Sequence, residues 1–211
     1  IMGTFNILSA ARGRNIKIIY ASTGSVLGSA EQPMAENHIK KPTTLYGISK
    51  GTAEEYCLFF CREFGVKTTI IRYFHVYGPR QDYDGPAGVI SIFLARAMRG
   101  LPLYVHGSGE QIRCFTFVLD DVAATLFLGE HDETIGQIFH VASPVRLSVI
   151  NLAKIIKDKY GGEIIHTEAR PGENLRPIPD TAKIEKLGFK VNTDFEVGLE
   201  LTANWVKNDL Q

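Results

Sequence analysis

The stretch Lys17-Ile-Ile-Tyr-Ala-Ser22 is a short apolar run of β type, and Lys67-Thr-Thr-Ile-Ile-Arg-Tyr-Phe-His-Val76 is a second one. Between them, residues 46–64 have a helical pattern that stops at Gly65. Strand, helix and strand within about sixty residues are typical of a βαβ unit, whose strands are parallel and whose crossover is right-handed. We therefore predict an α/β fold built on a doubly wound, Rossmann-type parallel sheet.

The pattern changes after Tyr77, where shorter strands and helices alternate without a repeat or a flexible linker. We predict that residues 1–80 belong to the doubly wound sheet and that residues 81–211 form mainly a smaller α/β domain. The further elements expected are helices at 3–12, at 88–99, from Asp120 and from Ser148 to Gly161, strands at 103–106, 112–118, 137–142 and 163–167, and two C-terminal helices.

The composition excludes several classes of protein. The 23 Lys and Arg residues balance 23 Asp and Glu residues, so no basic surplus indicates a nucleic-acid partner or a membrane surface. The apolar run at 89–98 is too short to span a bilayer, and Arg96 interrupts it. Three cysteines make no disulfide framework, and no signal peptide is in view, so we expect a cytoplasmic protein.

Tyr46 and Lys50 are four residues apart on the predicted helix, which places their Cβ atoms about 5–6 Å apart on one face. A tyrosine hydroxyl ordinarily ionises near pH ~10, and a neighbouring ammonium group favours the phenolate. Such a pair can take a proton from a substrate hydroxyl, although the same spacing is common on exposed helices. Thr23 follows the first strand, at the sheet edge where α/β proteins bind ligands.

Five segments together resemble the nucleotide-sugar epimerases and dehydratases of the extended short-chain dehydrogenase/reductase family. Pro42-Thr-Thr-Leu-Tyr46-Gly-Ile-Ser49-Lys50 is similar to their Pro-x-x-x-Tyr-x-x-Ser-Lys signature. The matches occur in family order and cover essentially the whole chain. The other four segments are residues 21–28, 72–81, 106–115, and 170–173 followed by Asp180.

The resemblance implies roles around an NAD cofactor. Tyr46 would be the catalytic acid and base, Lys50 its electrostatic partner and the anchor of the nicotinamide ribose, and Thr23 a proton relay that also contacts substrate. Tyr73 and Phe74 would line the pocket for the nicotinamide and the sugar. No metal is implied.

The resemblance also implies substrate contacts, with a nucleoside diphosphate sugar as the ligand. Arg113 and Arg170 would hold the diphosphate, for which a planar guanidinium suits paired oxygens, and Arg176 is a further candidate. His75 stands where the family usually has an asparagine that contacts substrate, so the substrate geometry there is expected to differ.

Two residues after Thr23 bear on the reaction. The family's 4,6-dehydratases carry Asp-Glu directly after the catalytic threonine, and its decarboxylases carry a glutamate two residues after it. Here Gly24 and Ser25 occupy these positions. The resemblance then implies epimerisation, most like that of the UDP-glucose 4-epimerases. The alternatives are a nucleotide-sugar reductase or dehydrogenase, and a non-catalytic fragment that keeps only substrate binding or assembly.

The family's Gly-x-x-Gly-x-x-Gly turn, which binds the cofactor pyrophosphate, is expected about ninety residues upstream of this region. These 211 residues do not include it. We therefore expect the chain to begin inside the dinucleotide-binding domain. Without the missing half we expect little affinity for NAD+.

Family members commonly pair two helices of the nucleotide domain into a four-helix bundle. The corresponding helices here are residues 3–12 and 46–64, and Phe5, Leu8, Leu58 and Phe59 give them more apolar surface than one sheet face needs. A homodimer through these two helices is therefore expected.

Overall fold

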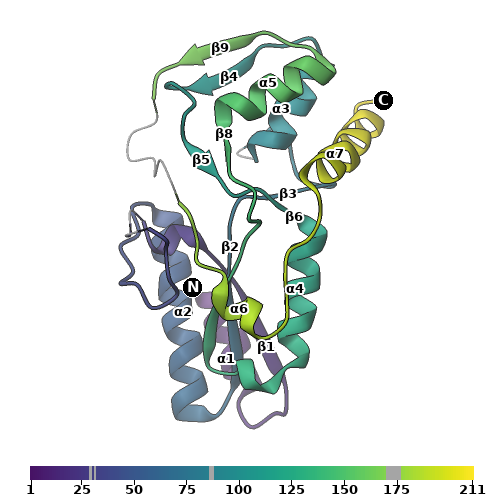
Figure 1. The fold of residues 1–211 in the computed structure, drawn as a ribbon. Helices are drawn as coiled ribbons and strands as arrows, with labels where there is room; N and C mark the ends of the chain where they lie inside the picture. Colours follow the sequence, from purple (N-terminus) through teal and green to yellow (C-terminus); the bar gives the residue numbers. More distant parts are fainter. Residues whose placement is uncertain (29, 31, 86–87, 170–176) are drawn as a thin grey trace. The chain divides into compact units, whose positions relative to one another are not determined.

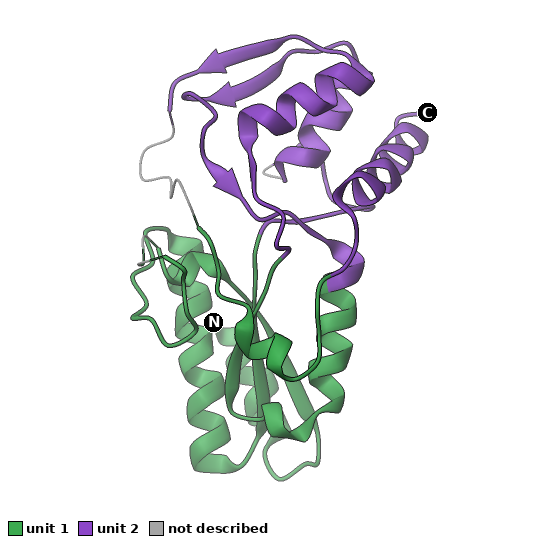
Figure 2. Cartoon of the chain, in the orientation of Figure 1, with its two compact units in different colours: residues 1–74, 121–142, 177–191 green, residues 75–120, 143–176, 192–211 purple. Residues whose placement is uncertain are grey.

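The computed structural model describes residues 1–28, 30, 32–85, 88–169 and 177–211 (Figure 1). They form two compact units, and each unit is assembled from three separate stretches of chain (Figure 2). Unit 1 comprises residues 1–74, 121–142 and 177–191, and unit 2 comprises residues 75–120, 143–176 and 192–211. The sequence suggested one boundary near residue 80, whereas the structure returns the chain to unit 1 twice. Among the described residues, no helix is both long enough and apolar enough to cross a bilayer.

Unit 1 is built on a sheet of three parallel strands in the order β1-β2-β7. The parallel pairing of β1 with β2 confirms the βαβ unit. Strand β7 then pairs with β2, which is why residues far beyond position 80 belong to this unit. Its elements are α1 (Met2–Ala11), β1 (Lys17–Thr23), the 3-10 helix η1 (Gly24–Val26), α2 (Leu45–Phe64), β2 (Lys67–Tyr73), α4 (Val118–Glu130) from Asp121 on, the 3-10 helix η2 (Asp132–Thr134), β7 (Gln137–Val141) and α6 (Ala182–Lys186).

Helices cover both faces of this sheet. Successive side chains of a strand point to opposite faces, so neighbouring residues of β2 pack against different helices. On one face Ile70 packs with residues of α1 and α2, including Leu8 and Cys57. On the other face Ile71 packs with residues of α4 and α6, including Leu128. A strand buried on both sides explains the nearly continuous apolar run in β2.

Helix α2 begins at Leu45, one residue before the predicted start, and ends at Phe64 as predicted. The Thr44 side chain accepts a hydrogen bond from the Gly47 N–H at 3.0 Å, and Gly65 ends the helix in the left-handed conformation at φ 65°. A Cβ at Gly47 would lie 2.7 Å from the carbonyl oxygen of Ser25. Glycine at this position therefore lets the first turn of α2 lie directly against η1.

Three predicted elements differ in the structure. The strand expected at 67–76 ends at Tyr73, since His75 adopts φ 46° and turns the chain out of the sheet. The strand expected at 112–118 is two short strands. The helix expected from Asp120 begins at Val118, so the carboxylates of Asp120 and Asp121 lie inside its first turn rather than before it.

Unit 2 packs three helices around one apolar core, to which Phe93, Leu152 and Leu199 contribute. Strand β4 pairs with β9 in parallel, β3 pairs with β6 in parallel, and β5 pairs with β8 in antiparallel fashion. Its elements are β3 (Val76–Tyr77), α3 (Val89–Met98), β4 (Leu103–His106), β5 (Ile112–Arg113), β6 (Thr116–Phe117), β8 (Leu147–Ser148), α5 (Val149–Tyr160), β9 (Ile164–Thr167) and α7 (Phe195–Asp209).

Candidate functional site

Polar side chains gather at the carboxyl end of β1 in unit 1. Thr23 is the last residue of β1, and its Oγ1 accepts the Ser25 N–H at 3.2 Å. Lys50 Nζ on α2 donates to the carbonyl oxygen of Ala21 at 2.6 Å and lies 6.0 Å from the centre of the Tyr46 ring. Tyr46 is 55% exposed, so its hydroxyl is accessible to a ligand. One edge of the sheet thus carries an exposed phenol, an ammonium group and a hydroxyl.

The half-buried position of Lys50 affects its proton affinity. Loss of solvent contact lowers the pKa of its ammonium group below the usual value. An ammonium group has three donors, so Lys50 can hold a ligand hydroxyl while it also donates to Ala21. Its distance to the Tyr46 ring suits electrostatic assistance to a developing phenolate.

Phe74 and Tyr73 follow one another but lie differently. The Phe74 ring is buried beside the turn after Thr23, where a Cβ on Gly24 would come within 2.2 Å of it. The Tyr73 side chain packs with the cluster on the α4 face, and its hydroxyl is 2.6 Å from Thr125 Oγ1. Burial raises the pKa of Tyr73. In this structure Phe74 therefore adjoins the Thr23 turn, while the Tyr73 hydroxyl is bonded elsewhere.

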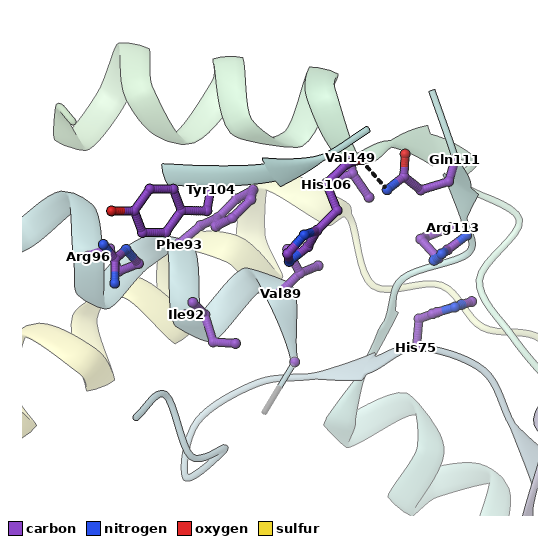
Figure 3. Close-up of a pocket in the computed structure, with 11 residues that line it drawn as sticks. His75, Val89, Ile92, Phe93, Arg96, Tyr104, His106, Gln111, Arg113 and Val149 are labelled. Atoms are coloured by element: carbon purple, nitrogen blue, oxygen red, sulfur yellow. Dashed lines mark hydrogen bonds between the residues drawn. The ribbon is translucent and has the colours of Figure 1, made fainter. Parts of the chain in front are cut away.

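Unit 2 contains a pocket of about 410 Å³, and Figure 3 shows the side chains around it. Two of the predicted substrate residues, His75 and Arg113, line it together. Arg113 is buried in β5, and its Nη1 donates to the carbonyl oxygen of Ile112 at 2.8 Å. The other lining residues are Gly88, Val89, Ile92, Phe93, Arg96, Tyr104, His106, Gln111 and Val149.

The imidazole of His75 is held neutral. Burial, and to a smaller extent the charge of Arg113, lowers the pKa of His75 to about 3. Its Nδ1 is buried and has no hydrogen-bond partner among the described residues. The pocket therefore combines a neutral polar ring with a cationic guanidinium, which suits a ligand that carries both an anionic group and hydroxyl groups.

The sequence did not single out Arg96, Tyr104, His106 or Gln111 as site residues. Residues 104 and 106 alternate with the buried Leu103 and Val105 along β4. This alternation in the sequence indicates that the two side chains lie on the face of β4 away from the core. The Arg96 guanidinium lies 4.5 Å from the centre of the Tyr104 ring. Gln111 Nε2 donates to the carbonyl oxygen of His106 at 3.3 Å, drawn as a dashed line in Figure 3. Arg170 and Arg176, the remaining predicted contacts, lie outside the described residues.

Comparison with known proteins gives consistent matches. Residues 1–142 match the model of the NAD-dependent epimerase/dehydratase family. The chain is 38% identical to a putative UDP-glucose 4-epimerase of Methanocaldococcus jannaschii, covering 99% of this chain and 69% of that protein. It is 36% identical to a UDP-N-acetyl-alpha-D-glucosaminuronate decarboxylase of Bacillus cytotoxicus, covering 98% and 70%. The crystal structure of a Thermotoga maritima UDP-glucose 4-epimerase with UDP-glucose superposes with a TM-score of 0.94 at 34% identity, covering 100% of this chain and 70% of that one.

Proposed function

The chain belongs to the NAD-dependent epimerase/dehydratase family, and from this premise we propose that it epimerises a nucleoside diphosphate sugar through a keto-sugar, in the manner of a UDP-sugar 4-epimerase. The family also contains enzymes that eliminate water and, among the relatives, a decarboxylase. The choice among these reactions depends on the groups beside Thr23.

The contact between Gly24 and Phe74 carries the proposal. Any Cβ at position 24 would come within 2.2 Å of the Phe74 ring, so no carboxylate side chain fits there without displacing a buried aromatic group. Ser25 carries only a hydroxyl, which lies 3.3 Å from Thr23 Oγ1. Elimination requires a further acid or base, whereas epimerisation requires only one group that removes and returns a proton. The turn after Thr23 therefore favours epimerisation.

The donor set at the end of β1 fits the nicotinamide riboside end of NAD. Lys50 would hold a ribose hydroxyl, Tyr46 would lie beside it, and Phe74 would border the ring site, whereas Tyr73 would contribute through its backbone position more than through its hydroxyl. NAD+ bound there would supply the hydride acceptor and donor that a reaction at the sugar carbon needs. Unit 1 is accordingly the proposed dinucleotide-binding part of the chain.

The residues of this chain supply proton transfer. The Tyr46 phenolate takes the proton of the sugar hydroxyl, and Thr23 shares that hydrogen bond as a relay. The Lys50 ammonium stabilises the phenolate by its charge. When the sugar has turned, the same Tyr46 hydroxyl returns the proton, so the enzyme ends in the state in which it began.

The pocket of unit 2 is the proposed site of the nucleoside diphosphate. Arg113 would bind the diphosphate by charge-assisted hydrogen bonds, and His75 would offer a neutral polar contact. Tyr104 and His106 present rings on the open face of β4, where a base can stack. Arg170 and Arg176 stay proposed substrate contacts by resemblance.

The direct test is turnover of UDP-galactose by the full-length protein with NAD+. We expect UDP-glucose as the product, with deuterium at the reacting carbon of the substrate retained in the product, because the hydride returns to the carbon it left. A reductase or dehydrogenase would instead consume or release a stoichiometric amount of reduced cofactor. A dehydratase would form a deoxy keto-sugar. Either outcome, or loss of the deuterium to solvent, would contradict the proposal.

A homodimer through α1 and α2 is the proposed assembly. Phe5 is 38% exposed and Phe59 is 44% exposed, and Leu58 and Phe59 border a shallow groove on α2. Leu8, which the sequence placed on the same surface, is wholly buried in the core and contributes nothing to it. The exposed aromatic side chains on these two helices support a helix-to-helix contact.

Substitution of Phe59 by Glu should convert the dimer to a monomer, because it places a charge in an apolar contact. The molar mass at micromolar concentration, measured by light scattering after size exclusion, checks this. Leu126→Glu is a matched control: Leu126 is 61% exposed on α4, which covers the other face of the sheet. That variant should stay dimeric. A monomeric mass for the unchanged protein would refute the assembly.

A further inference from the structure

A row of polar side chains crosses the sheet of unit 1 just before the carboxyl ends of its strands. Ser22, Arg72 and His140 are register partners on β1, β2 and β7. They are buried on the face that α2 covers, where Glu54 of α2 bonds to Ser22 and Arg72, and His140 Nε2 lies 3.4 Å from Arg72 Nη1. Neither the sequence motifs nor the proposed chemistry assigns this row a role.

Glu54 and Arg72 form a two-pronged ion pair in the centre of the row. Arg72 Nε donates to Glu54 Oε1 and Arg72 Nη2 donates to Glu54 Oε2, each at 2.8 Å. Ser22 Oγ donates to Glu54 Oε1 at 2.5 Å. The two charged side chains are 0% and 1% exposed. Burying such a pair costs desolvation energy that apolar residues of similar volume would not incur. Its main contribution is therefore not stability but the fixed position that its two hydrogen bonds give α2 relative to β2.

We propose that the Glu54–Arg72 pair positions the catalytic helix α2 against the end of β1. Tyr46, Lys50 and Glu54 are four residues apart and share one face of α2. Two of them bond to neighbouring residues of β1: Lys50 donates to the Ala21 carbonyl, and Glu54 accepts from Ser22. The next residue of β1 is Thr23. The pair therefore fixes how far Tyr46 and Lys50 lie along the helix relative to Thr23.

This positioning role rests on the proposed function, because it acts through Tyr46 and Lys50. The positive charge of Arg72 also neutralises the negative charge of Glu54, so the pair adds no net charge behind α2. Other titratable groups face the pair as well, and their charges also act on it. Lys40 Nζ lies 3.3 Å from Glu54 Oε2, and the remaining groups are Glu36 before α2, Tyr20 on β1, Cys57 on α2, His140 on β7 and Lys183 on α6.

Glu54→Gln in the full-length enzyme is the main test. The amide cannot form the two-pronged pair, so α2 loses its register and kcat should fall about 10- to 100-fold, while KM for the nucleotide sugar changes less. The substitution also leaves the Arg72 cation unpaired behind α2, and a net positive charge there favours loss of a proton from the active site. The acid limb of the kcat profile should therefore move to lower pH by about half to one unit.

Glu55→Gln is the matched control, because it makes the same change of charge one residue further along α2, on an exposed side chain that also pairs with Lys40. It should keep the parent kcat and the parent pH profile. In the double variant Glu54→Gln/Arg72→Met the unpaired cation is gone, so the acid limb should return toward its parent position while kcat stays low. If the pair had a purely structural role, the variants would be less stable, but the acid limb of the kcat profile would neither shift in the single variant nor return in the double variant.

Ser22→Ala decides the matter if the charge variants do not fold, since it removes only the hydrogen bond to Glu54. We expect a kcat reduced several-fold with an unchanged KM. Parent values of kcat and of the acid limb in folded Glu54→Gln, or parent kcat in Ser22→Ala, would overturn the inference. An active Tyr46→Phe variant would instead refute the proposed function, so the two failures are distinguishable.

Discussion

The Tyr46→Phe enzyme should lose about 10²- to 10⁴-fold in kcat, the range that one positioned acid–base group contributes. The phenol oxygen is the only atom removed, and the ring keeps its place over the first turn of α2. The nucleoside diphosphate is proposed to bind in unit 2, so KM for the nucleotide sugar should change little. Steady-state kinetics with UDP-galactose and NAD+ measure both quantities.

Tyr20→Phe is a useful comparison for this variant. Burial raises the pKa of Tyr20 to about 12, and its hydroxyl makes only a long contact, 3.5 Å, to the carbonyl oxygen of Lys50. It removes the same atom from a tyrosine on the neighbouring strand and should retain most of the activity. If Tyr46→Phe kept the parent kcat, Tyr46 would not be the acid–base group.

The second large effect is expected for Arg113→Ala. Loss of charge-assisted hydrogen bonds to a diphosphate costs about 1.5–3 kcal/mol, which corresponds to about a 10- to 100-fold weaker affinity. The chemistry takes place elsewhere on the sugar nucleotide, so kcat at saturation should change less than KM. Calorimetric titration with UDP, which lacks the sugar, should show the same loss.

Arg99→Ala serves as its control. Arg99 lies in the same unit, carries the same charge and pairs with Asp84 through two hydrogen bonds at the surface. It does not line the 410 Å³ pocket. Its replacement should leave the affinity for UDP unchanged. Equal losses in the two variants would indicate a general effect of charge and would contradict a specific diphosphate contact at Arg113.

The local part of the fold could be predicted from the sequence because its signals are local. Helix α2 has a threonine N-cap and a glycine that ends it, and β1 and β2 have apolar runs. Together they specify a βαβ unit, and the four-residue spacing of Tyr46 and Lys50 places the pair on one face of its helix. All of these features are determined by residues close together in the chain.

The remainder depended on contacts between distant residues. No sequence signal near residue 80 indicates that β7 later pairs with β2. The division of the chain into two interleaved units could therefore not be predicted as a single boundary. The burial of Leu8 depends on its helical phase against Ile70. The left-handed conformation of His75 is uncommon for a residue with a Cβ, and no local pattern indicated it.

The same limit applies to the site. Thr23 is predicted as a site residue from the segment 21–28, Tyr46 and Lys50 from the segment 42–50, and His75 and Arg113 from two further segments. Tyr104 and Arg96 line the pocket because β4 pairs with β9 and because α3 packs beside β4. A pattern within one sequence does not specify such long-range contacts. The Glu54–Arg72 pair joins a helix position to a strand position 18 residues away, and each residue alone is typical of an exposed charge.

The interleaving of the two units bears on how the polypeptide acquires its structure. The chain passes from one unit to the other after residues 74, 120, 142, 176 and 191. The central strand β2 is synthesised before its partner β7 and the covering helix α6, and a stretch of unit 2 separates β2 from β7 and a second separates β7 from α6. Pairings between remote residues slow folding, because the intervening loop must close first. On the ribosome, the Ile71 side of β2 therefore stays uncovered until α4, β7 and α6 have been synthesised, and nascent chains of this protein should depend on chaperones until then.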